Sequence, residues 1–207
     1  MKTSGKAAAI LLASGFSKRF GGRNKLLVSF LGKPLARYNL ELTASLDFQG
    51  GVFFVAANDA VAALAADFPR VRVIKNDAPV KGLRESVRLG VEAAGFSAEY
   101  YIFFHCDQPF LDVATVQRIL DERNHGCIVE PRYKGRPGNP CLFSAVFREE
   151  LLSLNEGETP RLIKCRHPSA LRVVEVFNPL VLEDIDDEET LERLSLLFPR
   201  ESILHGL

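Results

Sequence analysis

The chain has 207 residues, of which 47% are hydrophobic and 25% are charged, and its 26 Lys and Arg residues balance 26 Asp and Glu residues. These values are ordinary for a globular protein, and the length suits one α/β domain, so we expect residues 1–207 to form a single domain. With a formal net charge of zero, the chain lacks the broad positive surface that binding of long nucleic acids requires. The charge balance therefore favours a small ligand over a nucleic-acid partner.

No apolar run approaches the length of a membrane span, and residues 1–6 lead into a strand-like segment instead of a signal-peptide core. The four cysteines form no C-x-x-C pair, which argues against a zinc site or a disulfide framework. We expect them to be small buried hydrophobic residues. The chain is therefore expected to be a protein of the reducing cytoplasm with no membrane partner.

Apolar runs and helical patterns alternate along the chain. The expected strands are residues 7–12, 52–56, 71–74, 100–104, 127–130 and 173–176. The expected helices are one that begins at Pro34, with Leu35, Tyr38, Leu42 and Leu46 on its apolar face, and others at 60–66, 82–94, 113–123 (with Asp112 as N-cap) and 190–197. Repeated βα units predict a Rossmann-like α/β fold, a mainly parallel sheet with helices on both faces and ligands beyond the carboxyl ends of the strands.

One stretch breaks this alternation. Residues 132–140 are basic and rich in turn residues. We expect them to form a hairpin-like loop that reaches over the sheet edge, although a plain surface turn explains the same residues.

The loop after the first strand is the most informative segment, since residues 10–27 read ILLASGFSKRFGGRNKLL. Three glycines let the backbone approach a ligand closely and turn its N–H groups toward anionic oxygens, while cations such as Arg19 and Lys25 add full charges. The spacing fits neither the Walker loop nor the G-x-G-x-x-G dinucleotide loop. The segment therefore predicts a polyphosphate-binding loop of another kind.

This loop resembles the signature L-A-A/S-G-x-S-x-R-M/F-G-x-x-K-L-L of nucleotidyltransferases with a glycosyltransferase-A-like fold, closest to the MobA-like branch of molybdenum cofactor cytidylyltransferases and guanylyltransferases. The resemblance implies transfer of a nucleoside monophosphate from a nucleoside triphosphate to a phosphorylated acceptor, with release of pyrophosphate. It implies that Arg19 binds the β- and γ-phosphates and that Lys25 stabilises charge at the α-phosphate. The residues it implies for nucleotide binding are Leu12, Ala13, Ser14, Gly15, Arg19, Lys25, Gly82 and Ser86.

Two acidic segments resemble the metal-binding motifs of the same family. Asp107 directly follows a buried aromatic strand, and a carboxylate there is the hard oxygen ligand that Mg²⁺ prefers. Asp184-Ile185-Asp186 resembles the family's D-I-D, which implies that Asp186 is a second ligand. Neighbouring carboxylates such as Asp187 leave this assignment open, because acidic residues also favour helix N-termini for dipole reasons alone. The expected metal is Mg²⁺, with Mn²⁺ as the alternative, and the implied catalytic residues are Lys25, Arg19 and Asp107.

Two further segments resemble family motifs that flank the base and the acceptor. Residues 81–90 resemble G-M/L-x-x-S-L/V-x-x-G, in which Gly82 begins a helix near the base, although a capped amphipathic helix explains the same residues. Residues 136–143 resemble R-x-G-H/N-P-x-L-F, which implies acceptor contacts from Arg136 and Asn139. His105, at the end of a strand, is expected to serve packing and not catalysis.

The resemblance implies CTP as the donor, because Leu12-Ala13-Ser14-Gly15 resembles the L-A-A/S-G of cytidylyltransferases more than the L-A-G-G of guanylyltransferases. It implies molybdopterin as the acceptor and a molybdenum hydroxylase as the receiver of the product. GTP and another phosphorylated acceptor remain alternatives, as does a non-catalytic carrier of the cofactor. A nicotinamide-dependent oxidoreductase could use Asp59 after the second strand, but its glycine pattern is missing.

Overall fold

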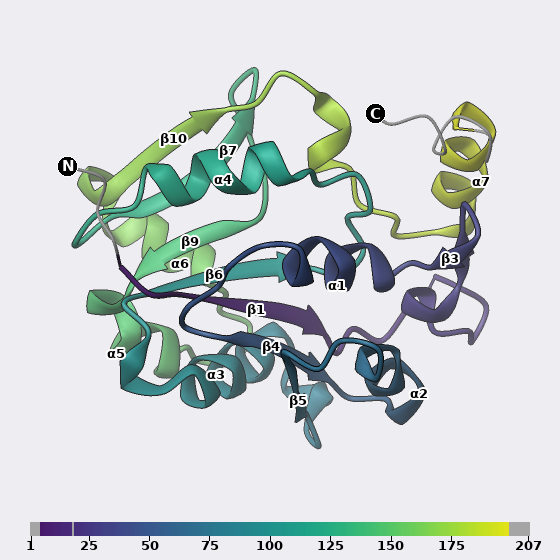
Figure 1. The fold of residues 1–207 in the computed structure, drawn as a ribbon, viewed down its shortest axis with the longest axis horizontal. Helices are drawn as coiled ribbons and strands as arrows, with labels where there is room; N and C mark the ends of the chain where they lie inside the picture. The colour runs from purple at the N-terminus through teal and green to yellow at the C-terminus, as the bar shows by residue number, and fades with distance from the viewer. Residues whose placement is uncertain (1–4, 18, 199–207) are drawn as a thin grey trace.

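A computed structural model describes residues 5–17 and 19–198. Its main sheet has the strand order β10-β7-β9-β6-β1-β4-β5, with β8 paired to β7 (Figure 1). These strands are β1 (Ala7–Ala13), β4 (Val52–Ala56), β5 (Val71–Lys75), β6 (Tyr100–His105), β7 (Ile128–Tyr133), β8 (Arg136–Pro137), β9 (Cys141–Ser144) and β10 (Leu171–Glu175). Apart from β8 and β9, they run parallel, which confirms the predicted α/β class.

The helices cover both faces of this sheet. The α-helices are α1 (Arg37–Ala44), α2 (Asp59–Ala62), α3 (Leu83–Ala94), α4 (Val113–Asp121), α5 (Arg148–Leu152), α6 (Pro160–Arg166) and α7 (Glu188–Leu197). The 3-10 helices are η1 (Lys25–Leu27), η2 (Ala63–Ala65), η3 (Pro79–Lys81), η4 (Gly95–Ser97), η5 (Ala145–Phe147), η6 (Pro168–Ala170) and η7 (Pro179–Leu182). None of the helices in the described ranges combines the length and hydrophobicity that spanning a bilayer requires.

The central strand β1 is buried on both faces, which explains its unbroken apolar sequence. Its odd-numbered residues face a core formed with α1, α2 and α4, and its even-numbered residues face a core formed with α3, α5 and α6. Helix α3 approaches β1 so closely that a Cβ atom on Gly90 would lie 2.3 Å from Cγ2 of Ile10. Close packing of α3 on β1 therefore explains Gly90, the last glycine of the motif at residues 81–90, without any role in nucleotide binding.

A third cluster lies beyond the ends of the parallel strands. It joins Phe20 of the glycine-rich loop, Phe30 and Leu35 around the small hairpin of β2 (Ser29–Phe30) and β3 (Lys33–Pro34), and Ile185 and Leu194 of the C-terminal segment; all five are fully buried. Figure 1 shows α7 and β3 side by side, beyond the end toward which the β1 and β6 arrows point. This cluster holds distant segments against the edge where ligands bind in such sheets.

The prediction of a helix beginning at Pro34 is wrong. Pro34 lies in β3, and α1 begins at Arg37. The reason is that the intervening backbone bonds back to the end of the loop: Leu35 N donates to Val28 O at 3.0 Å and Ala36 N to Leu26 O at 3.1 Å. The other expected helices and strands are present, most of them with shifted ends, and Asp112 does cap α4. The helix expected at 60–66 is the α-helix α2 followed by the 3-10 helix η2.

Sequence reasoning missed strand β9, which is antiparallel to both β6 and β7. Its four residues directly follow the turn-rich stretch, where a short apolar run gives no clear period. The stretch itself forms a hairpin from the end of β7, with Lys134 and Gly135 at the turn, both at positive φ. Sequence reasoning also missed α5 and α6, which line the other side of β9 and close the core there.

Candidate active site

The glycine-rich loop leaves β1 at Ala13 and returns to the sheet edge at Lys25. Oγ of Ser17 accepts a hydrogen bond from the backbone N of Lys25 at 2.9 Å, which closes the loop on itself. The side chain of Asn24 accepts from Leu26 N at 3.0 Å and caps η1. Phe20 anchors the middle of the loop in the third cluster. The loop is thus held at both its centre and its end, and Lys25 has a defined position.

The side chain of Lys25 lies between two carboxylates. Its Nζ is 2.6 Å from Oδ2 of Asp107 and 2.6 Å from Oδ1 of Asp186. Burial opposes the charged ammonium group, but the charges and hydrogen bonds of the two aspartates outweigh it and raise the pKa of Lys25 above 10.5. The lysine is therefore a permanent cation at neutral pH.

The two acidic segments are bonded to each other. The backbone N of Ile185 donates to the backbone O of Asp107 at 3.0 Å. Nε2 of Gln108 donates to Oδ1 of Asp184 at 2.5 Å. Burial, aided by the charge of Asp107, raises the pKa of Asp184, while the bond from Gln108 opposes the rise. Asp184 thus joins the segments, and Asp186, two residues later, reaches the lysine.

A buried asparagine on α1 fixes the loop that carries Asp107. Nδ2 of Asn39 donates to the backbone oxygens of His105 at 3.2 Å and of Gln108 at 3.0 Å. These bonds span the residues on either side of the aspartate. The loop that carries the Asp107 carboxylate is therefore fixed by α1 as well as by the end of β6.

The neighbouring carboxylates that left Asp186 uncertain have other partners. Oδ1 of Asp187 accepts from Thr190 N at 2.8 Å and caps α7. Hydrogen bonding from the Thr190 side chain, and then from its backbone, lowers the pKa of Asp187. Glu188 pairs with Arg23 at 2.6 Å on the surface. Of this acidic run, Asp186 is the residue placed against Lys25.

The oxygen donors here fit a hard divalent cation. Oδ1 of Asp107 is buried and has no hydrogen-bond partner among the described residues, while Asp186 is 52% exposed. No group of three or more His, Cys, Asp or Glu side chains with metal-binding geometry occurs in residues 5–17 and 19–198. A metal held by Asp107 and Asp186 would thus take its remaining ligands from phosphate oxygens and water, as Mg²⁺ commonly does.

A cavity of about 190 Å³ opens beside Lys25 and Asp107. It gathers nucleotide-binding residues predicted from two separate motifs: Leu12, Ser14, Gly15, Lys25, Gly82 and Ser86. Two of the predicted nucleotide-binding residues do not line it: Ala13 is buried in the core, and Arg19 is exposed on the loop. The predicted metal ligand Asp186 does not line it either, but contacts Lys25. His105, which was expected to serve packing and not catalysis, also lines the cavity. Its position at the end of β6 is the feature of the sequence that could have indicated this.

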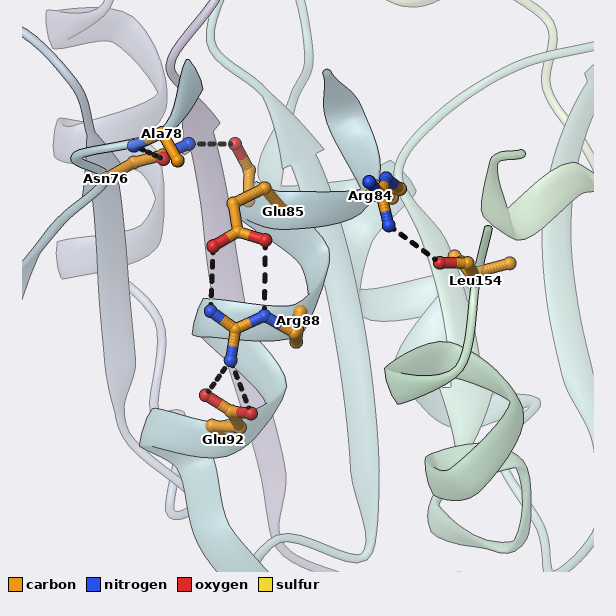
Figure 2. Close-up of polar contacts among 8 residues, drawn as sticks. Asn76, Ala78, Arg84, Glu85, Arg88, Glu92 and Leu154 are labelled. Atoms are coloured by element: carbon orange, nitrogen blue, oxygen red, sulfur yellow. Dashed lines mark hydrogen bonds and ion pairs between the residues drawn. The ribbon is translucent and has the colours of Figure 1, made fainter. Parts of the chain in front are cut away.

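The helix that follows Gly82 contributes to the wall of this cavity. Gly82 has a φ of +76° at the N-cap of α3, which a residue with a side chain would adopt only under strain. Ser86 accepts at Oγ from Nδ2 of Asn76 at 3.1 Å, and Asn76 in turn accepts from Ala78 N at 3.0 Å. Figure 2 shows Asn76 between Ala78 and the start of the helix. Gly82 and Ser86, at the N-terminal end of α3, therefore also form part of the cavity wall.

The predicted acceptor residues separate. Asn139 lines a second, larger cavity of about 460 Å³, whereas Arg136 is exposed and pairs with Glu183 at 3.3 Å. Asp59 is also exposed, in an ion pair with Lys75 at 3.4 Å. The four cysteines are free; three are buried as expected, but Cys165 is exposed.

The mixed sheet with helices on both faces is the glycosyltransferase-A-like fold that a solved nucleotidyl transferase shares. Residues 9–171 match the MobA-like NTP transferase domain, and the chain belongs to that family.

Three comparisons describe its neighbours. Nicotine blue oxidoreductase of Paenarthrobacter nicotinovorans is 27% identical over 197 residues, which cover 89% of this chain and 94% of that protein. A nucleotidyl transferase from Methanothermobacter thermautotroptrophicus (Mth528) has a TM-score of 0.79 at 21% identity, covering 98% of this chain and 99% of its own. Rv0371C of Mycobacterium tuberculosis, in complex with manganese, has a TM-score of 0.69 at 23% identity, covering 91% and 97%.

Proposed function

We propose that this protein is a molybdenum cofactor cytidylyltransferase, which transfers CMP from CTP to molybdopterin and releases pyrophosphate. The observation that carries the proposal is the contact of Lys25 with two carboxylates that lie 82 and 161 residues away in the chain. A cation and two hard oxygen ligands beside a cavity suit a reaction that depends on positioning and charge neutralisation.

In the proposed reaction, an oxygen of the acceptor phosphate attacks the α-phosphorus of CTP and forms one P–O bond. The bond from the α-phosphorus to the bridging oxygen breaks, and its electron pair leaves with pyrophosphate. Lys25 faces the charge at the α-phosphate, Arg19 binds the departing phosphates, and backbone groups of residues 12–15 hold the base and phosphates. No strong general base is needed, because the acceptor phosphate is already ionised.

A divalent cation, Mg²⁺ or Mn²⁺, would be held by Asp107 and Asp186 and would neutralise the triphosphate. The buried Oδ1 of Asp107 without a partner supports this assignment. The manganese complex of Rv0371C, a protein of the same fold, is consistent with it.

The choice of CTP rests on Leu12-Ala13-Ser14-Gly15, in which Ser14 occupies the place of the glycine in L-A-G-G. Oγ of Ser14 donates to Val55 O at 3.1 Å, so its side chain is fixed beside the cavity that Ser14 lines. A side chain at this position leaves less room for a purine. The proposal further includes a cytoplasmic location, which the free cysteines suit, and a molybdenum hydroxylase as the receiver of the product.

A second candidate arises from the curated relative, whose name is that of an oxidoreductase. A redox enzyme would need a hydride donor or another electron carrier and would release no pyrophosphate. The cationic and carboxylate groups at the mouth of the cavity favour the transferase, because hydride transfer has no use for paired metal-binding carboxylates.

The test is pyrophosphate release with molybdenum-loaded molybdopterin and Mg²⁺ or Mn²⁺, comparing CTP, GTP and ATP. We expect release with CTP that is lost in Asp107→Ala and retained in Asp121→Ala, a surface aspartate of α4. Release with GTP alone would overturn the donor. NADH or NADPH oxidation without pyrophosphate release would favour the oxidoreductase, and cofactor binding without turnover would favour the carrier.

A further inference from the structure

The larger cavity lies next to the nucleotide cavity. The two share Leu12, Leu83 and His105 as wall residues. The larger one, about 460 Å³, continues over β7, β9 and α6. This volume falls within the usual range for small-molecule sites, about 300–1,000 Å³. A ligand here would lie beside a nucleotide bound in the smaller cavity.

The charged residues that line this cavity are three cations and one carboxylate. Glu130 on β7 is 3% exposed, and its Oε1 accepts from Nε of Arg132 at 2.9 Å. Its Oε2 accepts from Nζ of Lys164, which lies on α6 across the cavity. An ionised carboxylate is tolerated at such depth only when it is paired and hydrogen-bonded. Glu130 thus accepts one hydrogen bond from Arg132 and one from Lys164, and these bonds hold both side chains in place.

Donor groups remain after this pairing. Arg132 contacts Glu130 through Nε, and its two terminal amino groups have no partner among the described residues. Arg161, on the same helix as Lys164, makes no ion pair or side-chain hydrogen bond within the ranges that the structure describes. A guanidinium group with free N–H donors matches the paired oxygens of a phosphate or carboxylate. The cavity therefore carries more positive charge than its one carboxylate can neutralise.

The remaining walls are largely apolar. Leu12, Leu83 and Leu171 line the cavity, and the buried rings of Phe103 and Phe143 form part of its lining. A ligand that fits this surface has an apolar body and at least one oxyanion. Of the two residues expected to contact the acceptor, Asn139 lines this cavity, whereas Arg136 does not, and its guanidinium group is paired with Glu183.

We infer that the cavity over β7, β9 and α6 is the acceptor site, and that Arg132 and Arg161 select acceptors by binding an oxyanion of the acceptor. Glu130 is a positioning residue, which orients Arg132 and Lys164 without touching the ligand's charge itself. This inference rests on the proposed function, because the ligand is an acceptor only if the protein transfers CMP to it. The binding of an anionic small molecule to this cavity can nevertheless be measured without turnover.

The experiment compares Arg161→Ala with Arg166→Ala. Both arginines are exposed on α6, but Arg166 faces Glu150 and Glu158 and does not line the cavity. In steady-state assays with CTP and molybdopterin, we expect Arg161→Ala to raise the KM for molybdopterin at least about tenfold, the scale of one lost charge-assisted hydrogen bond. The KM for CTP should stay unchanged, and Arg166→Ala should resemble the wild type in both.

Arg132→Lys is the second variant, because it keeps a cation beside Glu130 while removing the guanidinium fork. It should also raise the KM for molybdopterin without changing that for CTP. Calorimetric titration of the nucleotide-free protein supplies a second readout: molybdopterin should bind more weakly to Arg161→Ala than to the wild type, and the pterin lacking its phosphate should not distinguish the two.

The outcomes separate this inference from the proposed function. Wild-type turnover with an unchanged KM for molybdopterin in both arginine variants would overturn the acceptor site and leave the cytidylyl transfer intact. Absence of pyrophosphate release in the wild type would overturn the transfer, and the titration would then decide the site alone. Equal binding of molybdopterin to wild type and Arg161→Ala in that titration would overturn the site as well.

Discussion

Lys25 is the residue on which the site depends most. Its ammonium group is 2.6 Å from a carboxylate oxygen on each side, and its pKa is raised above 10.5, so it stays charged over the whole neutral range. We expect Lys25→Ala to lower the turnover of pyrophosphate release about 10²- to 10³-fold, the scale of one lost preorganised electrostatic contact. Lys6→Ala, at the opposite end of β1, is the control and should turn over like the wild type. Unchanged turnover in Lys25→Ala would remove the lysine from the mechanism.

The same substitution should act in the opposite direction on metal binding. In the structure, the ammonium group of Lys25 contacts both carboxylates that are proposed to hold the cation. A divalent ion entering between Asp107 and Asp186 must therefore compete with a positive charge a few ångströms away. We expect the nucleotide-free Lys25→Ala protein to bind Mn²⁺ at least about tenfold more tightly than the wild type, measured by electron paramagnetic resonance titration. Weaker binding would mean that the lysine supports the metal site.

The residues of the candidate site differ in how strongly the sequence indicates them. Lys25 and Asp107 each follow an apolar strand within a motif, so local spacing alone predicts that both lie at one edge of the sheet. Glu130 and Lys164 carry no such signal, because one is an ordinary strand position and the other an ordinary helix position, and only the fold brings them together. Interactions across a sheet depend on strand order, which the alternation of helices and strands leaves open.

At the scale of elements, α3 is stabilised by a buried acid. Glu85 accepts two hydrogen bonds from Arg88, at 2.7 and 3.2 Å, while Arg88 also binds the exposed Glu92 (Figure 2). The bond from Arg88 lowers the pKa of Glu85 below 4.5 despite the opposing effect of burial. A carboxylate with a depressed pKa stabilises the fold above its unfolded pKa, and this contribution disappears as the pH falls through its folded pKa.

We therefore expect Glu85→Gln to lower the free energy of unfolding by about 1–3 kcal/mol at pH 7. The loss of stability should become smaller as the pH falls below 4.5, because Glu85 has a pKa lowered from that value by its bond with Arg88. Glu92→Gln removes the exposed partner of the same arginine and should cost no more than about 1 kcal/mol. Urea unfolding at several pH values measures both, and a loss for Glu85→Gln that does not change with pH would contradict the electrostatic account.

The packing of α3 on β1 gives a second prediction for this element. A methyl group at Gly90 would meet Cγ2 of Ile10 at 2.3 Å, and β1 is too deeply buried to give way. Gly90→Ala should lower the free energy of unfolding by about 1–3 kcal/mol, although Gly to Ala in a helix is ordinarily favourable. In an Ile10→Ala background the same substitution should become neutral or stabilising. Equal costs in both backgrounds would show that another contact is responsible.

Element boundaries were less predictable than element types. The helix expected from Pro34 begins at Arg37 instead, because the backbone at Leu35 and Ala36 pairs with the end of the loop. The sequence does not predict strand β9, because a run of four residues after a turn carries no decisive period. The first case shows tertiary hydrogen bonding overriding a local preference, and the second shows a segment whose local pattern expresses no preference.

At the scale of the whole molecule, the site is assembled from both ends of the chain. The family match ends at residue 171, yet Asp186 and α7 lie beyond it. Ile185, next to Asp186, and Leu194 of α7 pack on the loop and the β2–β3 hairpin in the third cluster. The position of Asp186 therefore depends on the docking of a C-terminal segment that adds no strand to the sheet. Stability and metal binding should be coupled through this cluster.

Leu194 tests the coupling, because it is fully buried in the cluster at the inner face of α7. We expect Leu194→Ala to lower the free energy of unfolding by about 2–5 kcal/mol, the usual cost of a large-to-small change in a core. Leu196, on the same helix, is 83% exposed, so Leu196→Ala should change stability by less than about 0.5 kcal/mol. Urea unfolding measures both variants.

The cluster also predicts a functional effect of the same change. Loosening α7 displaces Asp186 but leaves Asp107, which is held by Asn39 and β6, in place. Leu194→Ala should therefore raise the metal concentration needed for half-maximal pyrophosphate release, with a smaller change in the rate at saturating metal. A variant that is destabilised but has the wild-type metal requirement would show that α7 serves stability alone, and that the second carboxylate is positioned by its bonds to the Asp107 loop.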